Sequence, residues 1–378
     1  MTRMRLLVRS HPRVAAYLVP ISAVVVALLV GAVILLRLDA SPIEAFTSMM
    51  DGAFGSSTAL MSTAIKATPL LLVGAGIVIA FRANVINIGG EGQMVSGALL
   101  ATTVALVMPE WPAIIALPTV LLAGIIGGAI WGAIPGALKA YYGVNEILST
   151  IMLNVVAVQL MNFLLRGPLI DPAEIERGTR IPQTERLMDS VDLPHLVGKL
   201  HIGPLLAVLA AIGVYVLMWR TPIGYRIRAV GLSRDASRYA GIEVRKTIVL
   251  AMTLSGALCG LAGAVLVFGS ESLRMVTDGS TAGFTGSAGF NGIVAALFGG
   301  LHAIWTIPAS FLFGGLLVGG LAMQRAVQVP SALILALNGL VVVFVVSSDR
   351  LRRGLLERGR RDIVERSDDH EPKVASDG

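Results

Sequence analysis

The chain is 378 residues long, and 55% of its residues are hydrophobic while only 14% are charged. That composition, with a mean hydropathy of +0.77, excludes an ordinary soluble domain, in which about 25% of residues are charged. The formal net charge of +6 is compatible with nucleic-acid binding. Basic loops that fix membrane topology explain it better in so apolar a chain, so we expect lipid and no nucleic acid as a partner. The single cysteine, Cys259, excludes a disulfide framework and a cysteine metal cluster.

In chain order, about ten apolar segments approach the length of about 20 residues that a helix needs to cross a bilayer. The first segment is too long for a signal peptide and has no clear cleavage site, so we expect a retained anchor. We therefore expect an all-α polytopic membrane protein, with residues 1–348 forming one transmembrane domain. The expected spans are 17–36, 66–82, 91–108, 113–136, 147–165, 203–219, 247–268, 287–301, 304–322 and 331–347.

Basic residues set the expected orientation of these spans. Four arginines precede the first span, and the 220–246 connection has seven basic residues against two acidic ones. An even number of spans places both termini and this connection on the same, cytoplasmic side. The 166–202 connection carries charges of both signs and several prolines, as an external loop does. The tail, 349–378, is charged and lacks an apolar period, so we expect it to be disordered.

Glycines in one span recur every four residues, at Gly124, Gly128, Gly132 and Gly136. This spacing places them along one stripe of a helix, where a neighbouring backbone can approach closely. Gly256 and Gly260 repeat the spacing in another span. The pattern predicts tight packing within a multi-helix bundle and not a ligand site.

A polar stretch, "NIGGEGQM" at residues 87–94, lies where the second apolar segment gives way to the third. Its glycines permit a helix break, which is tolerated at membrane depth only where the backbone is buried in protein or lines a cavity. Ionisable groups in a span are costly and mark pathways. We therefore expect a substrate pathway lined by Asn84, Asn87, Glu91 and Gln93. In this arrangement Arg82 could pair with Glu91. The alternative is that Arg82 is only a charge at a helix end and that Glu91 only caps the next helix.

A second glycine-broken stretch, "GFTGSAGFNGIVAALFGG" at residues 283–300, has a similar layout. In the expected topology the two stretches open spans that run in opposite directions. Paired interrupted segments of this kind point to a transporter with an inverted repeat and a binding site near the bilayer midplane. The repeat-like halves would be about 66–165 and 247–347, with Phe290 and Asn291 on the same pathway. Chance similarity is the alternative.

Enzyme motifs are missing from the sequence. There is no G-x-x-x-x-G-K-[ST] phosphate loop and no H-E-x-x-H zinc motif. We therefore expect a protein that is not an enzyme, binds no metal or cofactor and does not hydrolyse ATP itself.

Two motifs resemble those of permease subunits of ABC importers for nucleosides and simple sugars. The first has the form F-R-x-x-x-x-N-I-G-x-E-G-Q and includes Phe81, Arg82, Asn87, Ile88, Gly89, Glu91, Gly92 and Gln93. The second is similar to the cytoplasmic coupling segment of that family and includes Arg228, Ala229, Val230, Gly231, Ala236, Tyr239, Gly241 and Ile242. The resemblance extends over residues 60–347.

The resemblance implies a location in the bacterial plasma membrane and three protein partners. They are a cytoplasmic ABC ATPase that hydrolyses ATP, an extracytoplasmic substrate-binding lipoprotein and a second, paralogous permease. The ATPase would dock on the 220–246 loop at Arg228, Ala229, Gly231, Ala236, Tyr239 and Gly241. The loop alone would also fit an ordinary positive-inside connection.

Two questions remain open at this point. An ion-coupled secondary transporter of a small polar solute is the alternative function, although it needs a carboxylate relay and only Glu91 and Glu146 suit one. The substrate is expected to be a nucleoside because the resemblance indicates it, and a simple sugar remains open.

Overall fold

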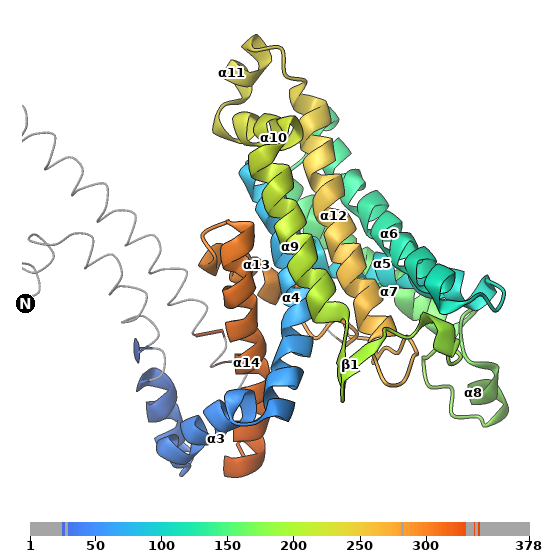
Figure 1. Ribbon diagram of the computed structural model, residues 1–378, viewed down its shortest axis with the longest axis vertical. Helices are drawn as coiled ribbons and strands as arrows, with labels where there is room; N and C mark the ends of the chain where they lie inside the picture. Colours follow the sequence, from blue (N-terminus) through green and yellow to red (C-terminus); the bar gives the residue numbers. More distant parts are fainter. Residues whose placement is uncertain (1–24, 27–28, 281–282, 330–335, 337–338, 341–378) are drawn as a thin grey trace, which may run out of the picture. The chain divides into compact units, whose positions relative to one another are not determined.

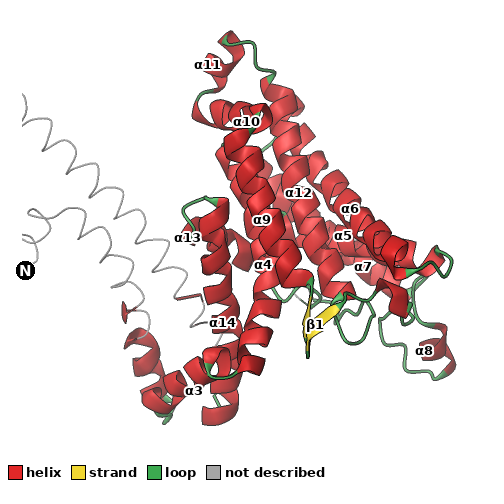
Figure 2. Cartoon of the chain, viewed as in Figure 1, coloured by secondary structure: helices red, strands yellow, loops and turns green. Residues whose placement is uncertain are grey.

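The computed structural model describes residues 25–26, 29–280, 283–329, 336 and 339–340 (Figure 1). The chain divides into a larger unit, residues 50–319, and a smaller unit formed by residues 1–49 and 320–378. The smaller unit contains a buried apolar cluster of Leu35, Ala45, Met323 and Val329. Helices dominate the described residues (Figure 2), which confirms the expected class of helical, polytopic membrane protein.

The larger unit holds most of the helices. Its helices in chain order are α4 (Ser57–Arg82), α5 (Gly90–Val107), α6 (Ala113–Tyr142), α7 (Glu146–Arg166), α8 (Pro172–Glu176), the 3-10 helix η1 (Asp189–Val191), α9 (Gly203–Arg220), α10 (Pro222–Leu232), α11 (Arg234–Tyr239), α12 (Val244–Phe268) and α13 (Ala288–Phe298). Two further helices, α3 (Pro42–Phe54) and α14 (Ala303–Val327), include residues of both units.

Six helices of the described residues are long and apolar enough to cross a bilayer, namely α4, α6, α7, α9, α12 and α14. All six are longer than the expected spans, and the ends of two of them show why. Helix α4 begins at Ser57 and not near 66, because the Ser56 hydroxyl caps it by accepting the Ala59 N–H at 3.1 Å. Helix α6 continues past residue 136 and ends before Gly143, whose φ of 70° is typical of a helix C-cap.

The predicted count of ten spans stays a prediction. Half of the first expected span, 17–36, and most of the tenth, 331–347, fall outside the described residues, as does the whole tail 349–378. The third and eighth expected spans correspond to α5 and to α13, which has only 11 residues. These two helices do not meet the length and hydropathy that the six others meet.

The 167–202 connection departs from the expected all-helical structure. Strands β1 (His195–Val197) and β2 (Leu200–His201) pair antiparallel in a small hairpin. The two-residue turn between them begins with Gly198 at φ 54°, and such tight turns favour glycine because they need a positive φ. In Figure 1 this hairpin and α8 lie at one end of the larger unit, and α10 and α11 lie at the other end.

Backbone contacts between α5, α6 and α12 form the centre of the larger unit. A Cβ atom on Gly128 would lie 2.2 Å from the carbonyl oxygen of Gly256, and one on Gly260 would lie 2.2 Å from that of Gly124. Such distances leave no room for a side chain. The close helix packing predicted from the four-residue glycine spacing is therefore confirmed for α6 and α12.

Candidate functional site

A break in the chain between α4 and α5 lies deep in the larger unit. Residues 83–89 leave the end of α4 and return to the interior, where α5 begins at Gly90. The break contacts Ser255 of α12 and Asn154 of α7. At 1.5 Å per residue, these two side chains are about 17 Å and about 12 Å from the first residues of their helices. The inner end of the break, at Asn87 and Ile88, therefore lies at mid-depth of the bundle.

Asn87 and Gln93 bind each other across this break. The Asn87 Nδ2 donates to Gln93 Oε1 at 3.0 Å, and the Gln93 Nε2 donates to Asn87 Oδ1 at 3.1 Å. Asn87 also donates to the Ser255 hydroxyl at 2.9 Å and accepts the Gly89 N–H at 2.9 Å. Both amides are buried, and buried polar groups are costly unless they are paired in this way.

Asn154 holds the two sides of the break together, although the sequence analysis did not single it out. Its Nδ2 donates to the Ile88 carbonyl at 2.9 Å, and its Oδ1 accepts the Gly92 N–H at 2.8 Å. Both backbone groups lie where no helix partner is available. An asparagine in the middle of an apolar span was the signal that could have identified it.

Glu91 connects the first turns of α5 and α13. Its carboxylate accepts the Thr285 hydroxyl and, at 3.2 Å, the backbone N–H of Phe290. The side chain is only 2% exposed. A Cβ on Gly289 would lie 2.5 Å from the Glu91 nitrogen, so glycine is what allows the two helix starts to meet. The positive ends of two helix dipoles thus converge on one carboxylate.

The structure brings five of the six predicted pathway residues to the break and to the Glu91 junction, where Glu91 meets the first turn of α13. Asn87, Glu91 and Gln93 are buried and bonded to protein groups, and Phe290 is 47% exposed. Asn291 follows on α13 and is partly buried. Contact of these residues with a substrate stays a prediction.

Asn84 is separate from the junction. It is exposed, has a positive φ of 54°, and its carbonyl accepts a hydrogen bond from Arg234 of α11 at 3.3 Å. The partner that the sequence suggested for Glu91, Arg82, donates from Nε to the Leu301 carbonyl at 3.0 Å and lies over the Trp219 ring.

The α10–α11 segment, residues 222–241, contains the predicted coupling residues. Tyr239 is 95% exposed, and Ala236 and Gly241 are exposed as well. Leu232, the last residue of α10, is 89% exposed and was not among the predicted residues. Two large apolar side chains thus stand free at this end of the larger unit, where Figure 1 shows α11 projecting beyond the other helices.

Helix α11 is the short helix of this segment. It runs from Arg234 to Tyr239 because the Ser233 hydroxyl accepts the Ala236 N–H at its start. At its end Gly241 has φ 77°, its N–H donates to the Arg238 carbonyl, and the Ile242 N–H donates to the Ser237 carbonyl. This is the Schellman pattern of helix termination, which favours glycine.

One of the remaining coupling residues, Gly231, contacts the start of the break. A Cβ on Gly231 would lie 2.0 Å from the Arg82 carbonyl oxygen, so α10 presses against the end of α4. Arg228 and Ala229 are partly buried on the same helix. Through Gly231 and Arg234, the α10–α11 segment therefore contacts the chain just before it enters the break.

Comparison with known proteins places these features in one family. The model of a family described as "Branched-chain amino acid transport system / permease component" matches residues 59–346. The matched region includes the break, the Glu91 junction and the α10–α11 segment.

Three relatives illustrate the similarity. The guanosine ABC transporter permease protein NupP of Bacillus subtilis is 35% identical over 346 residues, which cover 90% of this chain and 96% of the relative. The glucose ABC transporter permease protein TsgB13 of Haloferax volcanii is 34% identical over 358 residues, 91% of each chain. The guanosine ABC transporter permease protein NupQ of Bacillus subtilis is 27% identical over 258 residues, 67% of this chain and 78% of the relative.

Proposed function

Because the chain belongs to the family of branched-chain amino acid transport system permease components, we propose that it is the permease subunit of an ABC importer for a nucleoside. It lies in the bacterial plasma membrane with both termini and the α10–α11 segment in the cytoplasm. Its substrate is delivered from outside by a binding lipoprotein. ATP is hydrolysed by a separate ATPase subunit, and this chain binds no cofactor.

The observation that carries this proposal is the link between the exposed segment and the break. Tyr239 and Leu232 are available to a partner, and tyrosine is one of the residue types that often dominate interface energies. Arg234 and Gly231 of the same segment contact the backbone at residues 82–84. Movement of a docked ATPase is thereby transmitted to the chain that leads to the Glu91 junction.

The arrangement of α5 and α13 supports the inverted repeat and the ten-span topology. The two helices start beside each other at Glu91 and Gly289. The end of α13 leads to Leu301 beside Arg82 of α4, whereas Thr102 near the end of α5 contacts Met275 in the loop after α12. Two short helices that diverge from a common point are typical of repeats that meet at a binding site.

A second, paralogous permease is the proposed partner within the membrane. NupP and NupQ carry the same guanosine permease description in one organism, and both are similar to this chain. The transport pathway would then lie between two related permease chains.

A nucleoside is the proposed substrate because the guanosine relatives carry that description. A simple sugar is the second candidate, since the glucose permease relative is 34% identical. Ion coupling has less support. Glu146, which a carboxylate relay would need, lies 2.7 Å from Lys139 in an ion pair.

The test of this function is nucleoside uptake together with ATPase docking. We expect a strain that lacks this gene to lose uptake of radiolabelled guanosine, and excess glucose not to compete in the complemented strain. Uptake that survives ATP depletion but needs a proton gradient would refute the proposal.

Tyr239→Ala should weaken binding of the ATPase by about 2 kcal/mol or more, as expected of an interface anchor. Co-purification with the ATPase measures this loss. Gly241→Trp should uncouple ATP hydrolysis from substrate, because a bulky residue is strained at φ 77°. Tyr142→Ala is the matched control, since Tyr142 is 79% exposed at the end of α6, outside the segment. Full ATPase retention and stimulation in both variants of the α10–α11 segment would mean that the docking assignment is wrong.

A further inference from the structure

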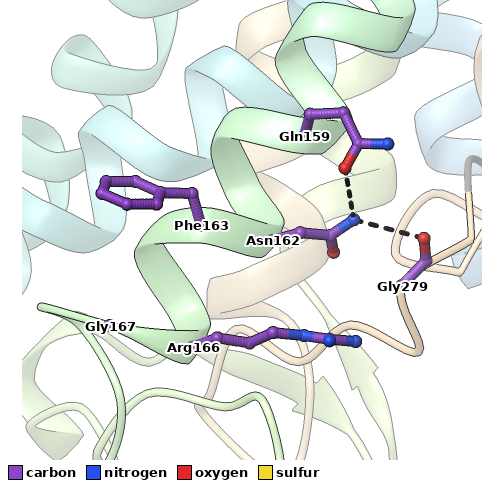
Figure 3. Close-up of a pocket in the computed structure, with 6 residues that line it drawn as sticks. All are labelled: Gln159, Asn162, Phe163, Arg166, Gly167 and Gly279. Atoms are coloured by element: carbon purple, nitrogen blue, oxygen red, sulfur yellow. Dashed lines mark hydrogen bonds between the residues drawn. The ribbon is translucent and has the colours of Figure 1, made fainter.

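A hollow of about 580 Å³ lies over the end of α7 that leads into the 167–202 connection. It is lined by Gln159, Asn162, Phe163, Arg166, Gly167 and Gly279 (Figure 3). Its volume is in the range of small-molecule sites. None of these residues belongs to the Glu91 junction or to the α10–α11 segment.

The position of Gln159 is unusual for a helix surface in a membrane. Helix α7 has 21 residues, so it is about 31 Å long, close to the hydrocarbon thickness. Gln159 is exposed and lies about 10 Å before Arg166 along the helix. An exposed carboxamide at that depth is unfavourable against lipid tails, which offer no hydrogen bonds.

The neighbouring helix α6 shows what a lipid-facing surface of this chain looks like. Its exposed large side chains are all apolar, and they include Ile114, Leu122, Ile126 and Ile130. Helix α7 also exposes apolar residues over its first half, such as Leu148 and Met152. The last two turns of α7 still expose Phe163, at 69%, but they add Gln159, Asn162 and Arg166. These polar groups indicate a surface that meets water or a polar ligand.

The polar groups of the hollow are held in place and offer mainly donors. Asn162 Nδ2 donates to the Gly279 carbonyl at 3.2 Å, and its Oδ1 accepts the Thr277 hydroxyl at 3.2 Å. Among the described residues, no ion pair includes Arg166. Figure 3 shows Gln159, Asn162 and Arg166 projecting to the same side of α7, toward Gly279. The Gln159 amide nitrogen and the Arg166 guanidinium thus present N–H groups to whatever occupies the hollow.

We propose that this hollow is an entry subsite of the transport pathway, in which Arg166 and Gln159 donate hydrogen bonds to the acceptor-rich edge of a nucleobase. The proposal rests on the proposed function and names residues that would contact its substrate. A guanidinium fork matches paired acceptors such as the O6 and N7 atoms of guanine. A sugar, whose hydroxyls donate as well as accept, gains less from a surface that mainly donates.

The first test measures access to water in membranes that contain the complete transporter. The only native cysteine, Cys259, is fully buried, so Gln159→Cys and Ile130→Cys can each be added to the natural chain. We expect a membrane-impermeant maleimide to label the Gln159→Cys protein and not the Ile130→Cys protein, and guanosine to slow that labelling. Equal resistance of both positions would place α7 against lipid and overturn the proposal. Labelling that guanosine does not slow would overturn the ligand assignment.

The second test measures transport kinetics. Arg166→Gln should raise the KM for guanosine about tenfold, the effect expected when one charge-assisted hydrogen bond is lost, with the maximal rate nearly unchanged. Arg166→Lys should recover only part of this loss, because a lysine lacks the planar fork. The matched control is Arg186→Gln, which removes an exposed positive charge of the adjoining 167–202 connection, outside the hollow.

Three results would contradict the entry subsite. An unchanged KM in the Arg166→Gln transporter would refute the subsite while leaving guanosine transport intact. An equal rise in KM in the Arg186→Gln transporter would reduce the effect to net charge. No uptake of any nucleoside by the natural transporter would refute the proposed function itself, and the nucleobase subsite with it.

Discussion

Glu91 is a single carboxylate that supplies acceptors to two other segments. We predict that Glu91→Ala lowers uptake to less than about a tenth of the natural rate, while the protein still inserts and assembles. The Thr285 hydroxyl and the Phe290 N–H would lose their acceptor, and each unmet buried donor costs about 1–3 kcal/mol. Glu91→Gln keeps one carbonyl acceptor and should retain more activity. The measurement is radiolabelled uptake normalised to the amount of protein in the membrane. An uptake rate in the Glu91→Ala strain equal to that of the natural protein would contradict the prediction.

Only part of this junction can be predicted from the sequence. The glycines and the acid of "NIGGEGQM" indicate a break, because their conformational freedom and charge are local properties. The partners of the break are 62 to 194 positions away along the chain, at Asn154, Ser255 and Thr285. No local pattern specifies such contacts, since they depend on how whole helices pack. For the same reason the sequence analysis placed Asn84 and Asn87 on one pathway, although in the structure Asn87 is buried and Asn84 is exposed beside α11.

Asp171 provides a prediction about pH outside the membrane-spanning helices. The hydrogen bond from Arg274, at 2.6 Å, holds the pKa of this carboxyl below its usual value, and the Ala173 N–H adds to the effect. A lowered pKa in the folded state stabilises the loop above the unfolded pKa of about 3.9 and loses that contribution as pH falls through the folded value. The 167–202 connection should therefore become more sensitive to pepsin below about pH 4.

Asp171→Asn tests the cause of that sensitivity at neutral pH. Without the ion pair, trypsin should cut the connection faster at pH 7 than in the natural protein. Asp189→Asn is the control. Asp189 and its partner Arg186 form an exposed ion pair, and exposed ion pairs contribute little to stability. Equal cleavage of both variants would show that the Asp171–Arg274 pair does not secure the connection.

Helix packing between α6 and α12 leads to a prediction at the level of elements. Gly128→Ala should destabilise the detergent-solubilised protein markedly, because its Cβ would lie 2.2 Å from a backbone oxygen that cannot move aside. Gly213→Ala, in α9, should be neutral or stabilise by up to about 1 kcal/mol, since nothing lies within 4 Å of its Cβ and alanine favours the helix. Thermal unfolding of the two variants checks this, and a similar loss in both would mean that helix propensity and not close contact matters at position 128.

The elements themselves were partly predictable. Apolar length locates the long helices, and glycine spacing predicts the α6–α12 contact. Their ends were harder to predict, because a cap such as Ser56 extends α4 through a stretch of mixed polar and apolar residues. The β1–β2 hairpin was missed because a turn of two residues gives little signal within a charged, proline-containing loop.

At the scale of the whole molecule, the topology predicts which ends of the bundle face which compartment. Tyr239→Cys should be labelled by an impermeant maleimide only from the cytoplasm, and Leu196→Cys, in β1, only from outside. Both side chains are exposed in the structure, so a lack of reaction from one side reports the membrane and not burial. Labelling of both positions from the same side would refute the proposed orientation.

The glycine contacts also bear on how such a chain moves. Interlocked side chains can change rotamer while two helices slide, but the contacts at Gly128, Gly256 and Gly260 join backbone to backbone and leave no atoms to rearrange. We expect α5, α6 and α12 to travel as one rigid body, so that hinge motion falls to α13, which has only 11 residues and is tied to that body at Glu91. A transport state in which α6 and α12 separate would contradict this, whereas one in which α13 swings away would place the hinge at the glycines around residue 289.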